Sequence, residues 1–89
     1  MGRSPRDRPL DLVPEPWPEV PSGDPLGEIG RTFVLNLREA MEGRSVRSVA
    51  DVAGLHHATL DKILAGRAWP DLATIGRLQI ALGVQFLRL

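Results

Sequence analysis

The strongest constraint on the fold lies between residues 45 and 63, where small and apolar residues follow a narrow pattern. Ala50 and Gly54 stand four positions apart, and Leu55 follows the glycine directly. An alanine permits the close approach of a second helix, and a glycine accepts the positive φ of a sharp turn. Apolar residues at helical spacing fill the sides that would face a core; they are Val49, Ala53, Leu60 and Ile63. The segment therefore predicts two short helices, at about 46–53 and 57–64, that cross at a tight turn.

A longer helix is predicted ahead of this pair. Asp24 followed by Pro25 is typical of a helix start, because aspartate accepts free N–H groups and proline has none to satisfy. Apolar residues continue at helical spacing until Gly43, which closes the helix. Gly27 and Gly30 weaken its first turns by up to ~1 kcal/mol each relative to alanine, so we expect the helix to fray or to start late.

A further helix is predicted behind the pair. Asp71 caps it, apolar residues recur along one side, and Gly83 ends it. The apolar tail, residues 84–89, is expected to form a short fifth helix or a strand. No segment alternates polar and apolar residues as a sheet of its own would require. The fold class is therefore all-α, a compact domain of four to five helices over residues 24–89.

Residues 1–23 differ in composition from the rest of the chain. Seven of the eight prolines lie at or before Pro25, and proline removes backbone donors and fixes φ. We predict a Pro-rich, extended and largely disordered N-terminal arm. Four apolar residues are still able to lie against the domain surface; they are Leu10, Leu12, Val13 and Trp17. Three arginines are candidates for a basic arm in a minor groove, although interleaved acids favour a solvated tail; they are Arg3, Arg6 and Arg8.

Composition excludes several classes of protein. The chain has no cysteine, which rules out disulfides and thiolate metal sites. Its longest apolar runs are far shorter than the ~20 residues that a membrane-spanning helix needs. The first ten residues carry three arginines but lead into no apolar signal-peptide core. We therefore expect a soluble cytoplasmic protein without a cofactor.

The charge distribution is uneven along the chain. The formal net charge is zero, whereas nucleic-acid binding usually leaves a basic footprint. Residues 1–24 carry three basic and five acidic side chains, and residues 25–89 carry eight basic and six acidic ones. Between Gly43 and Pro70 there are four basic residues against two acidic ones. The positive excess therefore lies on the predicted helix pair, and it predicts only weak non-specific affinity for DNA.

Residues 33–87 resemble the Cro and phage-repressor (Xre-type) helix-turn-helix family. The resemblance is carried by the segment from Ser45 to Ile63, by the turn Gly66-Arg67-Ala68-Trp69-Pro70, and by the closing Leu82-Gly83-Val84. It implies a phage-repressor-like domain that binds double-stranded DNA, with the helix at 57–64 in the major groove.

Two positions depart from that family pattern. The family often has glutamine at the start of the first helix of the pair, where this chain has Val46, and glutamate where it has Leu64. In the family the glutamine helps to hold a phosphate and the base-reading side chains. The fold tolerates both changes, but the usual positioning of DNA lacks these two groups.

The resemblance also implies roles for the outward side chains of the pair. The set implied to meet base edges is His57, Ala58, Asp61 and Lys62. The set implied to contact phosphates, and so to set the register on DNA, is Arg44, Ser45, Arg47, Thr59 and Arg67. Lys62 suits the guanine acceptors, Asp61 can accept from cytosine N4, and Ala58 can touch a thymine methyl group.

Several of these residues have a plainer interpretation. Asp61 and Lys62 are charged residues of the kind that usually form a solvated helix surface. His56 and His57 are adjacent, so they face different directions on a helix and do not favour a metal site. Trp69 is expected to cover the core between the third and fourth helices rather than to stack on a base. Within the family pattern we favour the DNA-binding roles.

Three classes of function follow from these patterns. The leading hypothesis is a sequence-specific transcriptional regulator that binds a pseudo-palindromic DNA site as a homodimer, with the tail Val84–Leu89 as the candidate interface. In that tail, Phe86 and Leu87 are either core caps or the dimer seam. The alternative is a protein-interaction module, such as an antitoxin or a small adaptor, whose arm folds on a protein partner. An enzyme is disfavoured, because no spacing of Ser, His and Asp fits a nucleophile–base pair or a metal centre.

Overall fold

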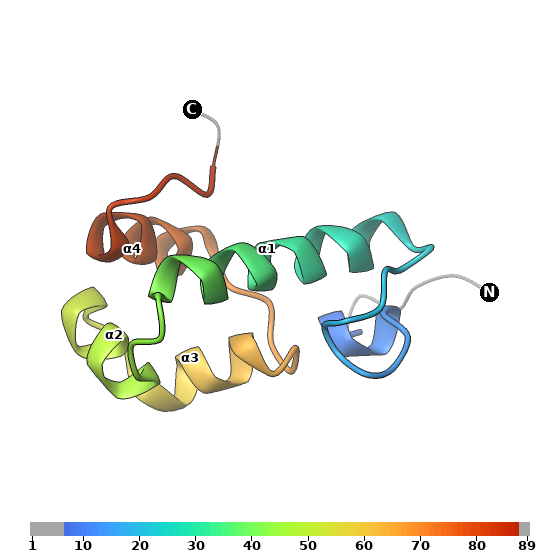
Figure 1. Ribbon diagram of the computed structural model, residues 1–89, viewed down its shortest axis with the longest axis horizontal. Coiled ribbons are helices and arrows are strands. Elements are labelled where there is room, and N and C mark those ends of the chain that lie inside the picture. The colour runs from blue at the N-terminus through green and yellow to red at the C-terminus, as the bar shows by residue number, and fades with distance from the viewer. Residues whose placement is uncertain (1–6, 88–89) are drawn as a thin grey trace.

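The computed structural model describes residues 7–87 as helical segments joined by short turns (Figure 1). The segments are the 3₁₀ helix η1 (Pro9–Leu12) and the α-helices α1 (Pro25–Met41), α2 (Val46–Ala53), α3 (His57–Leu64) and α4 (Leu72–Leu82). The described residues form no strand, so the all-α prediction is confirmed. No helix in this part of the chain is long and apolar enough to cross a membrane. The predictions for Arg3, Arg6 and the last two residues of the tail lie outside the described residues.

Side-chain caps start three of the helices where the sequence predicts them. Asp24 accepts two N–H groups in the first turn of α1. The Ser45 hydroxyl accepts the N–H of Ser48 at 3.1 Å, and a carboxylate oxygen of Asp71 accepts the N–H of Thr74 at 2.7 Å. The N–H of Thr74 lowers the pKa of Asp71, because it stabilises the charged carboxylate. Each cap satisfies N–H groups that have no partner inside the helix, and this fixes the three starts.

One apolar core joins the four α-helices. Figure 1 shows α2 and α4 at the end of the molecule where α1 finishes, with α3 below α1. α2 packs against both α3 and α4, and α3 also packs against α1. The buried side chains of this core are Val34, Leu37, Met41, Val49, Ala50, Ala53, Leu60, Ile63 and Leu78. Burying a side chain the size of leucine contributes about 1.5–3 kcal/mol, so this core holds α3 in a fixed orientation across α2.

Gly27 and Gly30 lie on the side of α1 that faces the arm, and both are buried. A Cβ at Gly27 would lie 2.6 Å from the carbonyl oxygen of Leu12, and one at Gly30 would lie 2.9 Å from a ring carbon of Trp69. The two glycines therefore permit a close approach that any larger residue would block. This contact offsets the helix-weakening effect of glycine, and α1 begins at Pro25 rather than late as expected.

Residues 7–23 of the predicted arm lie against the domain instead of extending from it. η1 packs against α1, and Figure 1 shows it beneath the N-terminal half of that helix. Val13 and Pro18 are buried, and Trp17 packs against the main core. The four apolar residues named from the sequence are all partly or fully buried. Prolines restrict the unfolded arm as well as the folded one, which reduces the entropy lost when the arm docks.

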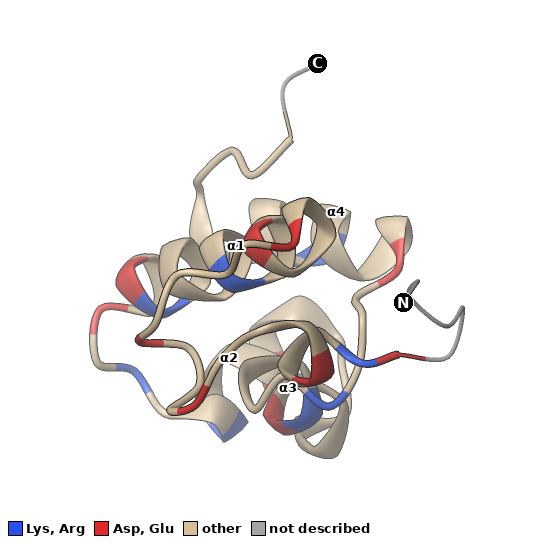
Figure 2. Cartoon of the chain, turned by 90° about the vertical axis from the view of Figure 1, so that its right-hand side faces the viewer, with Lys and Arg blue, Asp and Glu red and all other residues tan. Residues whose placement is uncertain are grey.

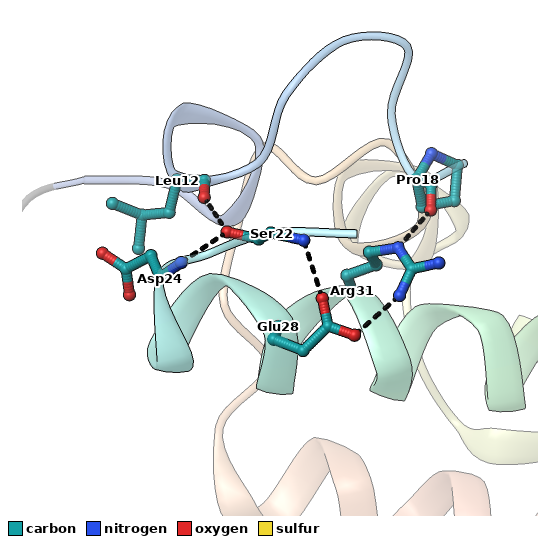
Figure 3. A network of polar contacts seen from close by, with 6 residues as sticks. All are labelled: Leu12, Pro18, Ser22, Asp24, Glu28 and Arg31. Atoms are coloured by element: carbon teal, nitrogen blue, oxygen red, sulfur yellow. Dashed lines mark hydrogen bonds and ion pairs between the residues drawn. The ribbon is translucent and has the colours of Figure 1, made fainter. Parts of the chain in front are cut away.

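Polar contacts tie the backbone of the arm to α1 (Figure 3). The Ser22 hydroxyl donates to the carbonyl oxygen of Leu12, and the Ser22 N–H donates to Oε1 of Glu28 at 2.8 Å. Arg31 donates to Oε2 of Glu28 at 2.7 Å and to the carbonyl oxygen of Pro18 at 2.8 Å. The Ser22 N–H, with a smaller effect from the charge of Arg31, lowers the pKa of Glu28. Glu28 and Arg31 of α1 thus supply hydrogen-bond partners to an N–H and a carbonyl group of the arm, whose prolines prevent regular helix or strand bonding.

A second ion pair closes η1. The Arg8 guanidinium donates to both carboxylate oxygens of Asp11, at 2.9 and 3.0 Å. These hydrogen bonds lower the pKa of Asp11 from its ordinary 3.8 to about 2. The pair is exposed to solvent, so it adds little to the stability of the fold.

The tail after α4 forms neither of the predicted elements over residues 84–87. The side-chain oxygen of Gln79 accepts the N–H of Phe86 at 2.7 Å and the N–H of Leu87 at 2.6 Å, in place of a helical or strand partner. The Phe86 ring meets the Phe33 ring edge to face, with centroids 5.2 Å apart. Phe86 therefore packs against the core of its own chain, which is the core-cap alternative.

Candidate nucleic-acid interface

The turn between α2 and α3 has the geometry that the sequence predicts. Gly54 has φ of 72°, a left-handed conformation in which a side chain is strained. Its N–H donates to the carbonyl oxygen of Asp51 at 3.3 Å, and the N–H of Leu55 donates to that of Ala50 at 2.9 Å. This pair of bonds satisfies two carbonyl groups in the last turn of α2 and ends the helix sharply. The chain then enters α3 after only two further residues.

The buried side of the pair is also confirmed. The five apolar positions predicted to face the core are each at most 6 % exposed; they are Val49, Ala50, Ala53, Leu60 and Ile63. Leu55 packs against the same core but is only half-buried. Because Leu60 and Ile63 anchor one side of α3, the opposite side of that helix is presented to solvent.

The four residues predicted to read bases are all exposed on α3. They are His57, Ala58, Asp61 and Lys62. Positions 57 and 61, and likewise 58 and 62, are four residues apart, so the set forms one patch one helical turn long. Within residues 7–87, the side chains of His57, Asp61 and Lys62 make no hydrogen bond or ion pair. Their polar groups therefore point to water and are available to a ligand.

The residues predicted to contact phosphate have more varied surroundings. The Ser45 hydroxyl already accepts an N–H as the cap of α2. The Arg44 guanidinium folds back on the end of α1 and donates to the carbonyl oxygens of Met41 at 3.1 Å and Ala40 at 3.4 Å. Arg44 would have to leave these carbonyls to reach a phosphate. Three members of the set remain exposed without such contacts in the described structure; they are Arg47, Thr59 and Arg67.

Arg67 follows a second left-handed glycine turn, at the end of α3. Gly66 has φ of 72°, and its N–H donates to the carbonyl oxygen of Ile63 at 3.1 Å. The N–H of Arg67 donates to the carbonyl oxygen of Lys62 at 2.9 Å. The backbone of Arg67 is thereby fixed beside the last turn of α3, the same helix that carries the exposed patch.

The electrostatic character of this surface is mixed. Figure 2 shows basic and acidic residues together on α3. The basic side chains here are Arg47, Lys62 and Arg67, and the acidic ones are Asp51 and Asp61. The surface therefore offers separate charged donors and acceptors rather than a broad basic field, an arrangement suited to specific contacts more than to general attraction.

The structure places one group at this site that sequence reasoning missed. The Trp17 indole N–H donates to the carbonyl oxygen of Leu64 at 2.9 Å, and the N–H of Leu10 donates to that of Gly66 at 2.9 Å. A Cβ added to Gly66 would lie 2.6 Å from the Trp17 ring. The arm therefore covers the C-terminal end of α3. The sequence signal for this contact was Trp17, a large apolar residue between two prolines. The proline-rich composition around it favoured disorder instead.

Trp69 packs in a different place from the one expected. Its ring lies on Gly30 of α1, and its indole N–H donates to the carbonyl oxygen of Asp7 at 2.8 Å. It therefore joins α1 and the arm rather than covering a seam between α3 and α4. Trp69 also lines an apolar groove of about 550 Å³, together with Ile29, Phe33 and Phe86.

The two adjacent histidines lie at the start of α3. His56 occupies the cap position but makes no side-chain cap bond, and both histidines are exposed. Among the residues that the structure describes, no group of three or more histidine, aspartate or glutamate side chains is placed to hold a metal ion.

Comparison with known proteins identifies this arrangement. A helix-turn-helix family model matches residues 35–89, which include α2, α3, α4 and the C-terminal part of α1. The match leaves out the arm and residues 25–34 of α1. The comparisons with curated proteins and with solved structures gave no match. With α2 and α3 as its DNA-binding helix-turn-helix, the chain belongs to the Cro and phage-repressor (Xre-type) family.

Proposed function

We propose that the protein is a transcriptional regulator that binds double-stranded DNA sequence-specifically, with the outward side of α3 in the major groove. One observation carries the proposal. His57, Asp61 and Lys62 are exposed and unengaged within the described structure, while Leu60 and Ile63 on the other side of the helix are buried. A rigid helix with free donors and acceptors can meet base edges without first breaking contacts of its own.

The contacts divide into two kinds. Lys62 can donate to the O6 and N7 acceptors of guanine, and Asp61 can accept from cytosine N4. Ala58 suits a thymine methyl group, and His57 can donate to a base or to a phosphate. Arg47 and Arg67 flank α3 and are suited to phosphates, which fix the register without carrying sequence information.

The proposed regulator binds its site as a homodimer, because a symmetric pair of domains reads two half-sites about one helical turn apart. Leu72, Gly76 and Ile80 stand four positions apart and lie along one line of α4. Leu72 is 70 % exposed and Ile80 is 86 % exposed. Since Phe86 is engaged with Phe33 in its own chain, this line of α4 extends the candidate interface beyond the tail.

Selection of duplexes from a random-sequence library tests the proposal, with Lys62→Ala and Arg67→Ala as a matched pair of charge deletions. Lys62→Ala should cost roughly 1–3 kcal/mol on the selected site and relax its sequence preference at one position. Arg67→Ala should weaken all duplexes alike and reduce the salt dependence. The selected sites should show two half-sites in inverted orientation. A library that yields no duplex bound below the micromolar range at low salt would overturn the proposal.

A second candidate function is a protein-interaction module, such as an antitoxin or a small adaptor. The apolar groove beside α1 favours it, because Ile29 in its lining is 65 % exposed. Val46 and Leu64, which replace two polar residues of the family pattern, point the same way. A stoichiometric protein partner that is lost in Ile29→Asp and retained in Lys62→Ala would favour this function over DNA binding.

A further inference from the structure

The C-terminal end of α3 is held from outside the helix by the arm. Trp17 donates its indole N–H to the carbonyl oxygen of Leu64, and Leu10 donates its backbone N–H to that of Gly66. The last carbonyl groups of a helix have no partner within it, so the bond from Trp17 replaces water at the end of α3, and the bond from Leu10 holds the turn that follows. The Trp17 ring lies directly over Gly66, where there is no room for a Cβ.

This contact acts on the residue that follows. Arg67 comes directly after Gly66, and its own N–H is bound to Lys62 in α3. The segment 64–67 is thus fixed on one side by α3 and on the other by Trp17. A turn held from both sides fixes the backbone from which the exposed Arg67 side chain extends, which lowers the backbone entropy lost when that side chain binds a phosphate.

The arm is itself anchored at a second place, so it can transmit this restraint. Arg31 of α1 holds the carbonyl oxygen of Pro18, the residue next to Trp17, and also pairs with Glu28 (Figure 3). Arg31 is mostly buried, with its side chain 14 % exposed. The arm therefore bridges α1 and the end of α3. Leu10, Trp17, Pro18, Glu28 and Arg31 lie outside residues 35–89, the part that matches the family, whereas the carbonyl groups that they hold at Leu64 and Gly66 lie inside it.

We propose that Trp17 is a positioning residue for DNA binding, which holds the turn 64–67 so that Arg67 meets a phosphate. This inference rests on the proposed function and adds the arm to the DNA-binding machinery. It predicts that removal of Trp17 abolishes one phosphate contact, and that this loss is the same one that removal of Arg67 causes.

The salt dependence of DNA binding tests the proposal on the full chain and the duplex selected above. Each phosphate contact contributes roughly 0.9 to the slope of log affinity against log salt concentration. Arg67→Ala and Trp17→Ala should each reduce the slope by about this amount, and the double variant should reduce it no further. A Trp17 that only stabilises the fold would lower the competent fraction equally at every salt concentration, so the slope would stay at the wild-type value.

Trp69→Phe is the matched control, because it also deletes one indole N–H bonded to a carbonyl group, but at Asp7 rather than on α3. It should leave the slope unchanged, and it leaves Trp17 as the remaining tryptophan, whose blue-shifted emission reports a docked arm. If circular dichroism shows that Trp17→Ala is unfolded, Trp17→Phe decides, since it keeps a ring over Gly66 and loses the bond to Leu64. An unchanged slope in the folded Trp17 variant, or an additive loss in its double variant with Arg67→Ala, overturns the proposal.

Failure of the proposed function gives a different result. In that case the wild-type chain binds no duplex. Hydrogen exchange then still tests the structural part, because the N–H of Arg67 should exchange faster in the Trp17 variant than in Trp69→Phe. Equal exchange rates in those two variants would show that Trp17 does not hold the turn 64–67, whether or not DNA binds.

Discussion

The α2–α3 pair and the arm differ in how their structures are encoded. The pair follows its sequence pattern closely, and the helices at 46–53 and 57–64 have the predicted bounds. Residues 7–23, predicted to be extended, are instead packed on the domain. In the pair, the cap, the turn glycine and the apolar positions that pack together all lie within about twenty residues of one another in the sequence. In the arm, the decisive hydrogen bonds join residues that are far apart in the sequence. Trp17 and Leu64 are separated by 47 positions, and Trp69 and Asp7 by 62.

The contrast shows what composition can and cannot predict. Prolines do exclude a regular helix or strand from the arm, and only a short 3₁₀ turn occurs there. They do not exclude docking, because a restricted chain loses less entropy when it is fixed in place. The arm is held by buried proline and valine surface, and by donors from α1 and Trp17. A proline-rich segment with few regular hydrogen bonds can therefore still be part of a domain.

The largest expected effect is on the free energy of unfolding. Substitutions in the helix pair should lower it more than substitutions in the arm, because the pair contributes more to the core. Leu60 on α3 is fully buried, so Leu60→Ala should cost roughly 2–5 kcal/mol of the free energy of unfolding. Val13 in the arm is 7 % exposed, and Val13→Ala removes only two methyl groups, worth about 1–2 kcal/mol. Urea titrations of both variants measure the difference. A larger loss in Val13→Ala would mean that the arm, and not the helix pair, dominates the stability.

A smaller effect should come from two glycines with the same positive φ. Gly54 and Gly66 both have φ of 72°, and alanine in this region costs roughly 1–2 kcal/mol at either position. At Gly54 the new Cβ would meet only the end of the Arg77 side chain, at 3.4 Å, whereas at Gly66 it would displace the Trp17 ring. Gly66→Ala should therefore be the more destabilising of the two.

The same comparison can be repeated in a Trp17→Ala background. The added cost at Gly66 should vanish there, because the ring that causes it is gone. Thermal or urea unfolding of the four variants provides the measurement. Equal costs at the two glycines in the wild-type background would show that the arm does not press on the turn.

The smallest effect should appear on acidification and should affect the arm. The hydrogen bonds from Arg8 lower the pKa of Asp11 to about 2, and chiefly the N–H of Ser22 lowers that of Glu28. A carboxyl group whose pKa is lower in the folded state stabilises that state while it is ionised. The contribution is therefore full above the unfolded pKa and is lost as pH falls through the folded pKa.

Tryptophan emission in the Trp69→Phe variant, recorded from pH 5 to pH 2, follows this loss at Trp17. The emission should shift to the red as the pH falls. Asp11→Asn should reduce the change, because asparagine lacks the charge that pairs with Arg8. An emission that stays constant to pH 2 would show that these carboxylates do not help to hold the arm. Since the Arg8–Asp11 pair is exposed, we expect a modest change.

The helix bounds and the exposed patch on α3 could be predicted, because caps and apolar spacing are local. The surroundings of Arg44 could not, because its guanidinium can bind either a phosphate or the free carbonyls at the end of α1, and only the structure shows which it takes. The conformation of residues 84–87 was predicted wrongly for a similar reason. The side chain of Gln79 accepts the N–H groups of Phe86 and Leu87 in place of backbone carbonyls. The DNA-binding roles of His57, Asp61 and Lys62 stay predictions.

The bond between Trp17 and Leu64 bears on how portable the DNA-binding helix is. A protein engineer who transplants residues 46–64 into another member of the family would carry the turn at Gly54 and the buried face intact. The tryptophan that closes the far end would stay behind, and the open carbonyls would be left to water. A transplanted α3 should therefore bind DNA best when residues 7–23 and the first half of α1 are transferred together with it.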